Sequence, residues 1–225
     1  MIQVIIVGEG PTEESFIRDV LVPHLADRHI FVQPRLIPTS RRGRGGALSG
    51  DRVLRYLRNT LRERSDSYVA TFFDLYALDR EFPGRAETVA VADPLVRASA
   101  IEVRFAEAVV REAQCRADRF LPHIQPYEFE ALLFSDTDRW VEIEPAWKRN
   151  AEPLRAVRAG VISPEHINDG AETHPSARLG KLLRPRFEKV LHGPAAAARI
   201  GLDRIREECK HFGSWLVRLE ALPPL

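Results

Sequence analysis

The chain has 225 residues, of which 44% are hydrophobic and 29% are charged, and its net charge is +1. This length permits one sizeable domain, or one domain with a helical extension, and the balanced charge neither demands nor excludes a nucleic-acid partner. Two cysteines far apart in the sequence exclude a zinc-finger spacing and a disulfide framework. Because no apolar run approaches the roughly 20 residues of a membrane span, we expect a cytoplasmic protein without membrane contact.

The first residues of the chain predict a strand, an acidic loop and a helix. Residues 4–7 are an apolar, β-branched run, which is typical of a buried parallel strand. Glu9 follows between two glycines, and apolar residues at helical spacing then predict a helix over residues 13–26. A carboxylate at the carboxyl end of a first strand lies where open α/β sheets bind ligands. Glu9 is therefore a metal-ligand or acid–base candidate, with Glu13 in support.

The middle of the chain alternates between strand and helix patterns. Strands are expected at 31–37, 68–73 and 120–125, and helices at 50–64, 86–92, 100–113 and from 131 onward. Pro34 predicts that the second strand lies at an edge of the sheet or is irregular. Short links between these elements predict an α/β fold, a mostly parallel four-stranded sheet flanked by helices.

Strand patterns fade after residue 136. Trp140 and Trp147 indicate helical structure packed on the core, residues 161–176 indicate a loop, and helices are expected at 179–191 and 202–222. We therefore expect an α/β core at residues 1–136. A helical C-terminal layer, residues 137–225, would pack on that core.

Acidic residues follow three of the predicted strands. Glu9 follows the first strand, Asp74 ends the third, and Glu128 and Glu130 come after the fourth. Because the carboxyl ends of parallel strands share one edge, we expect these carboxylates to meet in one pocket. Clustered carboxylates repel each other unless cations or protons compensate, and Mg²⁺ or Mn²⁺ takes such oxygen ligands. The alternative is that these acids are helix caps and surface charges.

Basic residues offer candidate phosphate contacts. Arg41, Arg42 and Arg44 lie in a glycine-rich loop, and Lys181 lies in a later predicted helix. Guanidinium groups match phosphate geometry, so these four residues are candidates for holding a nucleic-acid backbone. The alternative is a solvated loop. The histidines are scattered, and we interpret each as a structural or surface residue.

Several motifs together resemble a known family. They are GEGPTEE at 8–14, FFDLYAL at 72–78, FPG at 82–84, IQPYEFEALLFSD at 124–136 and IND–E–PS–RL within 167–179. The chain resembles the Toprim-like domain-of-unknown-function family DUF4276. The resemblance implies a Toprim-type fold with a metal site at the strand ends, as in topoisomerases, primases and nucleases of the overcoming-lysogenization-defect type. It also implies an ATPase partner of the AAA or ABC type in an anti-phage or stress system.

The resemblance makes Glu9 the Toprim glutamate and Asp74 the first acid of the Asp-x-Asp motif. Tyr76 stands where the second acid is expected, so Asp79 or the pair Glu128 and Glu130 would have to substitute. Tyr127 stands where the family usually has a histidine.

The expected function is a Toprim-like phosphodiesterase, a nuclease acting on DNA or RNA with Mg²⁺ or Mn²⁺. Glu9 and Asp74 would be catalytic metal ligands, and Glu13, Glu128 and Glu130 would complete the metal site. One alternative is a non-catalytic interaction subunit of an ATPase complex, and another is a phosphohydrolase of small substrates. A nucleic acid, an ATPase and a second copy of the chain are the candidate partners.

Overall fold

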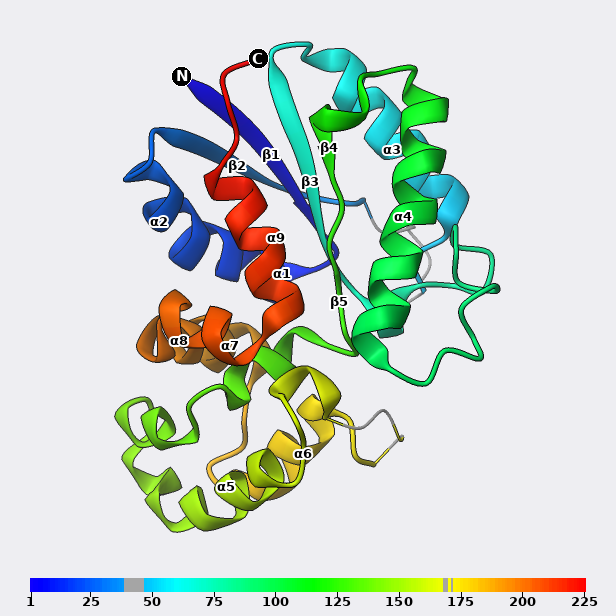
Figure 1. The fold of residues 1–225 in the computed structure, drawn as a ribbon. Helices are drawn as coiled ribbons and strands as arrows, with labels where there is room; N and C mark the ends of the chain where they lie inside the picture. Colours follow the sequence, from blue (N-terminus) through cyan, green and yellow to red (C-terminus); the bar gives the residue numbers. More distant parts are fainter. Residues whose placement is uncertain (39–46, 168–169, 171) are drawn as a thin grey trace.

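The computed structural model describes residues 1–38, 47–167, 170 and 172–225. A parallel sheet lies between two helical layers, with further helices beneath its carboxyl edge (Figure 1). The strands are β1 (Ile2–Gly8), β2 (Ile30–Leu36), β3 (Ser67–Asp74), β4 (Phe120–Leu121) and β5 (Ile124–Gln125). Their order is β2-β1-β3-β4, β5 also pairs with β3, and every pairing is parallel. The predicted α/β fold is therefore confirmed.

The strand predictions were right in place but incomplete in detail. β2, which contains Pro34, lies at an edge of the sheet as expected, where a missing N–H costs no central ladder bond. The single strand predicted at 120–125 is two short strands, because Pro122 and His123 interrupt it. A fifth strand, β5, is the result.

Both faces of the sheet are covered. Val4 and Ile6 of β1 pack on one side, and Ile5 and Val7 pack on the other, which explains the continuous apolar run. The first side is covered by α1 (Pro11–Phe16), a π-helical turn (Ile17–Leu21), α2 (Val22–Ala26), α7 (Lys189–Ile200) and α9 (Lys210–Glu220). The second side is covered by α3 (Gly50–Glu63) and α4 (Pro94–Ala113).

The remaining C-terminal elements are short. They are η4 (Phe129–Phe134), η5 (Thr137–Glu142), η6 (Pro145–Asn150), α5 (Ala151–Ala159), η7 (Pro164–His166), α6 (Pro175–Leu182) and α8 (Leu202–Glu208). Trp140 and Trp147 lie in the 3-10 helices η5 and η6, and both are fully buried. They belong to the same apolar core as Val4 and Phe72. Among the described residues no helix is both long and apolar enough to cross a lipid bilayer.

The helix predicted at 86–92 is wrong, because this stretch forms turns. Thr88 donates its hydroxyl to the Gly84 carbonyl at 2.8 Å, and Gly84 has a φ of 83°. The following helix begins earlier than expected, at Pro94. Asp93 caps it by accepting from the Leu95 and Val96 N–H groups at 2.9 and 3.0 Å.

Two long C-terminal helices were also predicted wrongly. The helix expected at 179–191 is split into α6 and α7 by a segment that contains Pro185, which has no N–H to continue a helix. The helix expected at 202–222 is split at Cys209, where the backbone leaves the helical region with ψ 87°. The loop expected at 161–176 contains η7 and the first residues of α6.

Candidate metal centre

The acidic residues meet where the strand order reverses. The chain passes from β1 to β2 on one side of β1 and then to β3 on the other, and such switch points bind ligands at the carboxyl ends of the strands. Glu9 directly follows β1, Asp74 ends β3, and Glu13 lies in the first turn of α1. One carboxylate oxygen from each lies within 4.8 Å of the other two. We call Glu9, Glu13 and Asp74 the acidic cluster.

Backbone groups position the acidic cluster. The Phe129 N–H donates to Asp74 Oδ1 at 2.8 Å, and the backbone of Asp74 acts to lower the pKa of Glu9. A side chain at Gly10 would place its Cβ 3.1 Å from Glu13 Oε2, so a glycine lets this carboxylate approach. Among the described residues, Glu9 Oε2 is buried without a hydrogen-bond partner. The cluster therefore offers a buried, unsatisfied acceptor.

Burial and mutual repulsion raise the pKa values of these acids. Burial, followed by the nearby Glu13, raises the pKa of Glu9 well above its ordinary value. Burial raises the pKa of Glu13 to about 7, and Glu130 adds to the rise. Burial, followed by Glu9, raises the pKa of Asp74 well above its ordinary value. At neutral pH a proton or a cation must therefore compensate this cluster.

Glu128 and Glu130 pair with Lys189, which lines the same cavity as the acidic cluster. Lys189 Nζ lies 3.2 Å from Glu130 Oε1 and 3.4 Å from Glu128 Oε1. Glu128 also accepts from the Ser176 N–H at 3.0 Å and contacts His174 Nδ1 at 3.0 Å. Burial raises the pKa of Glu128, but Lys189, Ser176 and His174 outweigh it and lower the pKa overall. Burial raises the pKa of Glu130.

Two cavities open around these side chains. The acidic cluster, Glu130, Arg52 and Tyr76 line a cavity of about 600 Å³. A second cavity of about 900 Å³ is lined by Arg184, Arg186, His174, Ser176 and others. Lys189 lines both. An acidic pocket and a basic hollow therefore share one ammonium group.

The family comparison covers nearly the whole of this architecture. The model of the family described as domain of unknown function (DUF4276) matches residues 8–220. The chain belongs to DUF4276. The matched range starts at the last residue of β1 and includes the acidic cluster and Lys189. Comparison with curated proteins found no match, and comparison with solved structures found none either.

The structure of this DUF4276 chain places one of the four predicted phosphate contacts, Lys181. Arg41, Arg42 and Arg44 lie outside the described residues. Lys181 is exposed and pairs with exposed Glu172. Among the residues that the structure describes, Lys181 is not in the lining of either cavity.

Three cationic or polar residues at the site were not among the sequence candidates. Arg52 lines the acidic cavity, and its Nε is buried without a partner among the described residues. Lys189 begins α7, but the helix predicted at 179–191 had placed it in a last turn, where a cation is favourable and attracts no notice. His174 precedes α6 and has no local signal either.

Tyr76, which stands where the Toprim resemblance predicts a second acid, lines the acidic cavity. Its side chain is 39% exposed, and its ring packs 5.9 Å from those of Tyr127 and His174. Asp79, a suggested substitute, accepts instead from the Glu81 N–H within a turn. Glu13, rather than Asp79, is the third member of the close carboxylate group.

Proposed function

We propose that this member of DUF4276 is a Toprim-like, metal-dependent phosphodiesterase that cleaves nucleic acid with Mg²⁺ or Mn²⁺. The observation that carries the proposal is the convergence of Glu9, Glu13 and Asp74 within 4.8 Å, with Glu9 Oε2 unsatisfied among the described residues. Hard oxygen ligands of this kind suit Mg²⁺, which keeps several waters and substrate phosphates in its shell.

The residues fit such an ion, because a buried acceptor without a donor needs a positive charge. Glu9, Glu13 and Asp74 would hold it, with Glu130 lining the same cavity. When bound, a divalent ion polarises a phosphoryl oxygen and lowers the pKa of a water.

Cationic side chains would orient the phosphate. Lys189 and Arg52 both line the acidic cavity, and Arg52 Nε is a buried donor without a partner in the described structure. Arg184 and Arg186 extend the positive surface through the neighbouring cavity. A basic hollow beside the acidic pocket favours a substrate with several phosphates, so it supports nucleic acid over a small phosphate ester.

A cleavage assay tests the proposal. The full chain is incubated with single- and double-stranded DNA and RNA, with Mg²⁺, Mn²⁺ or a chelator. Glu9→Gln and Asp74→Asn should each lower metal-dependent cleavage, Asp74→Asn by about 10³-fold, whereas Asp79→Asn, which follows β3 but is not in the cavity lining, should not. Wild-type rates in both acidic variants would refute the assignment.

Tyr76 favours a second candidate, a non-catalytic interaction subunit of an ATPase complex. A tyrosine at the position of the second acid removes one hard ligand from the expected motif. Calorimetry separates the two proposals. Saturable Mg²⁺ or Mn²⁺ binding that is lost in Asp74→Asn supports the nuclease, and no binding supports the interaction subunit.

A further inference from the structure

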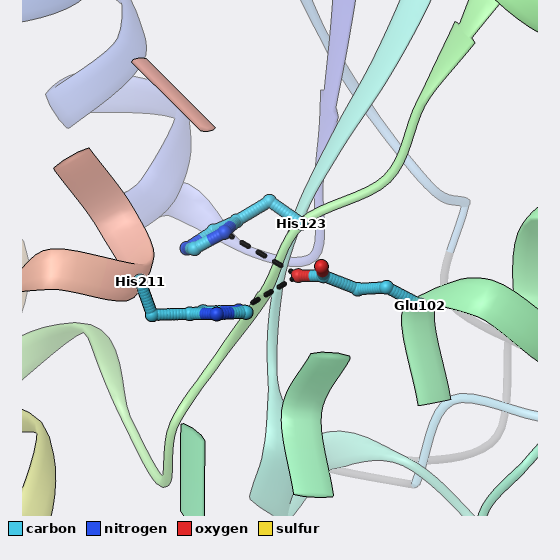
Figure 2. A group of neighbouring side chains, drawn as sticks. All are labelled: Glu102, His123 and His211. Carbon is cyan, nitrogen blue, oxygen red and sulfur yellow. Dashed lines mark hydrogen bonds and ion pairs between the residues drawn. The ribbon is translucent and has the colours of Figure 1, made fainter. Parts of the chain in front are cut away.

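A second group of ligating side chains lies beside β4 and β5, the edge strands opposite β2. None of its residues belongs to the acidic cluster. Glu102 comes from α4, His123 from the break between β4 and β5, and His211 from the first turn of α9. One ligand atom from each lies within 4.8 Å of the other two. Figure 2 shows the Glu102 carboxyl group pointing toward both imidazole rings. We call these residues the histidine cluster.

The distances in the histidine cluster are those of groups that can share an ion. His211 Nε2 lies 2.8 Å from Glu102 Oε1, and His123 Nδ1 lies 3.5 Å from the same oxygen. Ligands around a tetrahedral zinc at about 2.0–2.1 Å lie roughly 3.3 Å apart. Small side-chain adjustments, with release of the hydrogen shared by His211 Nε2 and Glu102 Oε1 to solvent, would therefore bring the three atoms around one cation.

His123 presents an unsatisfied nitrogen to this group. Its Nε2 lies 3.1 Å from Gln125 Oε1, an oxygen that can only accept, so Nε2 carries the hydrogen. With the hydrogen on Nε2, the other nitrogen of a neutral ring, Nδ1, bears a lone pair. Nδ1 is buried with no hydrogen-bond partner among the described residues. A lone pair thus faces a carboxylate oxygen, and a cation between them would satisfy both.

The surroundings hold the ligands in place. The fully buried His123 ring stacks between Phe72 and Trp215, at centroid distances of 5.2 and 4.9 Å. Glu165 accepts the His211 N–H at 3.0 Å and so fixes the start of α9. The Ile124 N–H donates to Glu102 Oε1 at 2.7 Å. Such supporting contacts orient the ligands of metal sites.

We propose that Glu102, His123 and His211 bind a divalent transition-metal ion, for which Zn²⁺ is the first probe. Two imidazole nitrogens and one carboxylate suit Zn²⁺, Fe²⁺ or Ni²⁺, whereas Mg²⁺ prefers oxygen ligands alone. The ion would fasten α9 to α4 across the broken edge strand. This site is independent of the proposed nuclease activity.

Metal titration of the tag-free full chain tests the site. The protein is stripped with a chelator, kept in millimolar Mg²⁺ to occupy the acidic cluster, and titrated with Co²⁺ while its visible absorption is followed. We expect one Co²⁺ per chain with ligand-field bands, displacement by Zn²⁺, and a rise in Tm. Zinc-edge X-ray absorption should show imidazole scattering from nitrogens at about 2.0 Å.

Variants locate the ion. Glu102→Gln, whose amide oxygen still accepts the Ile124 N–H, and His123→Phe, which keeps a stacked ring, should each weaken Co²⁺ binding at least about 100-fold. Asp74→Asn should leave it unchanged. His24→Gln is the matched control, because His24 pairs with Glu220 at 2.6 Å outside the cluster.

Two results would overturn the proposal. One is a wild-type chain that takes up no Co²⁺ or Zn²⁺ in the presence of Mg²⁺, as expected if Gln125 turns its amide nitrogen to His123 and Nδ1–H donates to Glu102. The other is undiminished binding in Glu102→Gln. Circular dichroism tests whether each variant is folded. If His123→Phe is unfolded, the binding of Co²⁺ by Glu102→Gln decides the outcome.

Discussion

The acidic cluster and the histidine cluster differ in how their buried charges are compensated. In the acidic cluster three carboxyl groups face one another, and their pKa values rise because burial and mutual repulsion oppose ionisation. In the histidine cluster Glu102 meets an imidazole partner. Burial opposes protonation of His211, but the hydrogen bond to Glu102 raises its pKa above the ordinary value.

The difference teaches what each cluster needs. The acidic cluster is incompletely neutralised by the chain itself, since Lys189 pairs first with Glu130 and Glu128. It therefore stores repulsion that a hard cation would relieve. The histidine cluster already links α4, α9 and the edge of the sheet through hydrogen bonds from Ile124 and His211, so an ion there would replace the hydrogen between His211 and Glu102.

The largest effect is expected for Asp74 of the acidic cluster, where cleavage should be lost without a loss of stability. Asp74→Asn should lower the rate of cleavage about 10³-fold, roughly 4 kcal/mol of transition-state stabilisation. The Tm of the metal-free variant should not fall, because its amide oxygen still accepts from Phe129 while the repulsion with Glu9 is gone. Cleavage assays and thermal melts measure the two quantities. A marked loss of Tm would show that this carboxylate stabilises the fold.

In the histidine cluster, by contrast, removing a carboxylate should destabilise the metal-free fold. Glu102→Ala should lower the free energy of unfolding of the metal-free chain by about 3 kcal/mol, because it strands a buried partner. His211 loses its carboxylate, and the Ile124 N–H loses its acceptor. Urea unfolding measures the change, with Glu107→Ala, an exposed α4 acid, as the control. A loss no larger than in the control would contradict the contrast between the clusters.

The pH dependence of stability should also differ. Glu13 has a folded pKa of about 7 against an ordinary value of 4.5, so the folded state binds its proton more tightly. The resulting stabilisation is present below the lower value and is lost as the pH rises through the higher one. The Tm of the metal-free chain should therefore fall between about pH 5 and about pH 8.

Millimolar Mg²⁺ should restore Tm mainly at the alkaline end, where the acidic cluster is ionised. Thermal melts with and without Mg²⁺ measure this. Glu13→Gln should flatten the profile, and Glu14→Gln serves as the neighbouring control. An equal rise in Tm on adding Mg²⁺ at about pH 5 and at about pH 8 would argue that the ion binds elsewhere.

The smallest effect is expected at Lys181. Its ammonium group is exposed, pairs with Glu172 and lies outside the lining of both cavities among the described residues. Lys181→Ala should weaken nucleic-acid binding less than about threefold, as for an exposed ion pair. Lys189→Ala should weaken it about tenfold or more, because this residue lines both cavities. Fluorescence anisotropy with labelled oligonucleotides measures both, and equal losses would restore Lys181 as a primary phosphate contact.

Local sequence patterns predicted the part of the acidic site that comes from single strands. Glu9 and Asp74 end apolar runs, and every buried parallel strand ends at the same edge, so their meeting followed from topology alone. Glu13 followed from helix periodicity. Glu128 and Glu130 were predicted as ligands, and the structure places them around Lys189, which no strand pattern predicted.

The sequence by itself determined the parallel sheet, its edge strand and the acidic ends of β1 and β3, because these depend on apolar period and on residues adjacent along the chain. The break near Pro185 also has a local cause, which the helix prediction overlooked. Only the tertiary structure decided the break at Cys209 and the meeting of Glu102, His123 and His211. Those ligands come from α4, a strand break and α9, more than 100 residues apart at the extremes. Their convergence depends on how two helical layers pack against one sheet edge, and no local spacing encodes that packing.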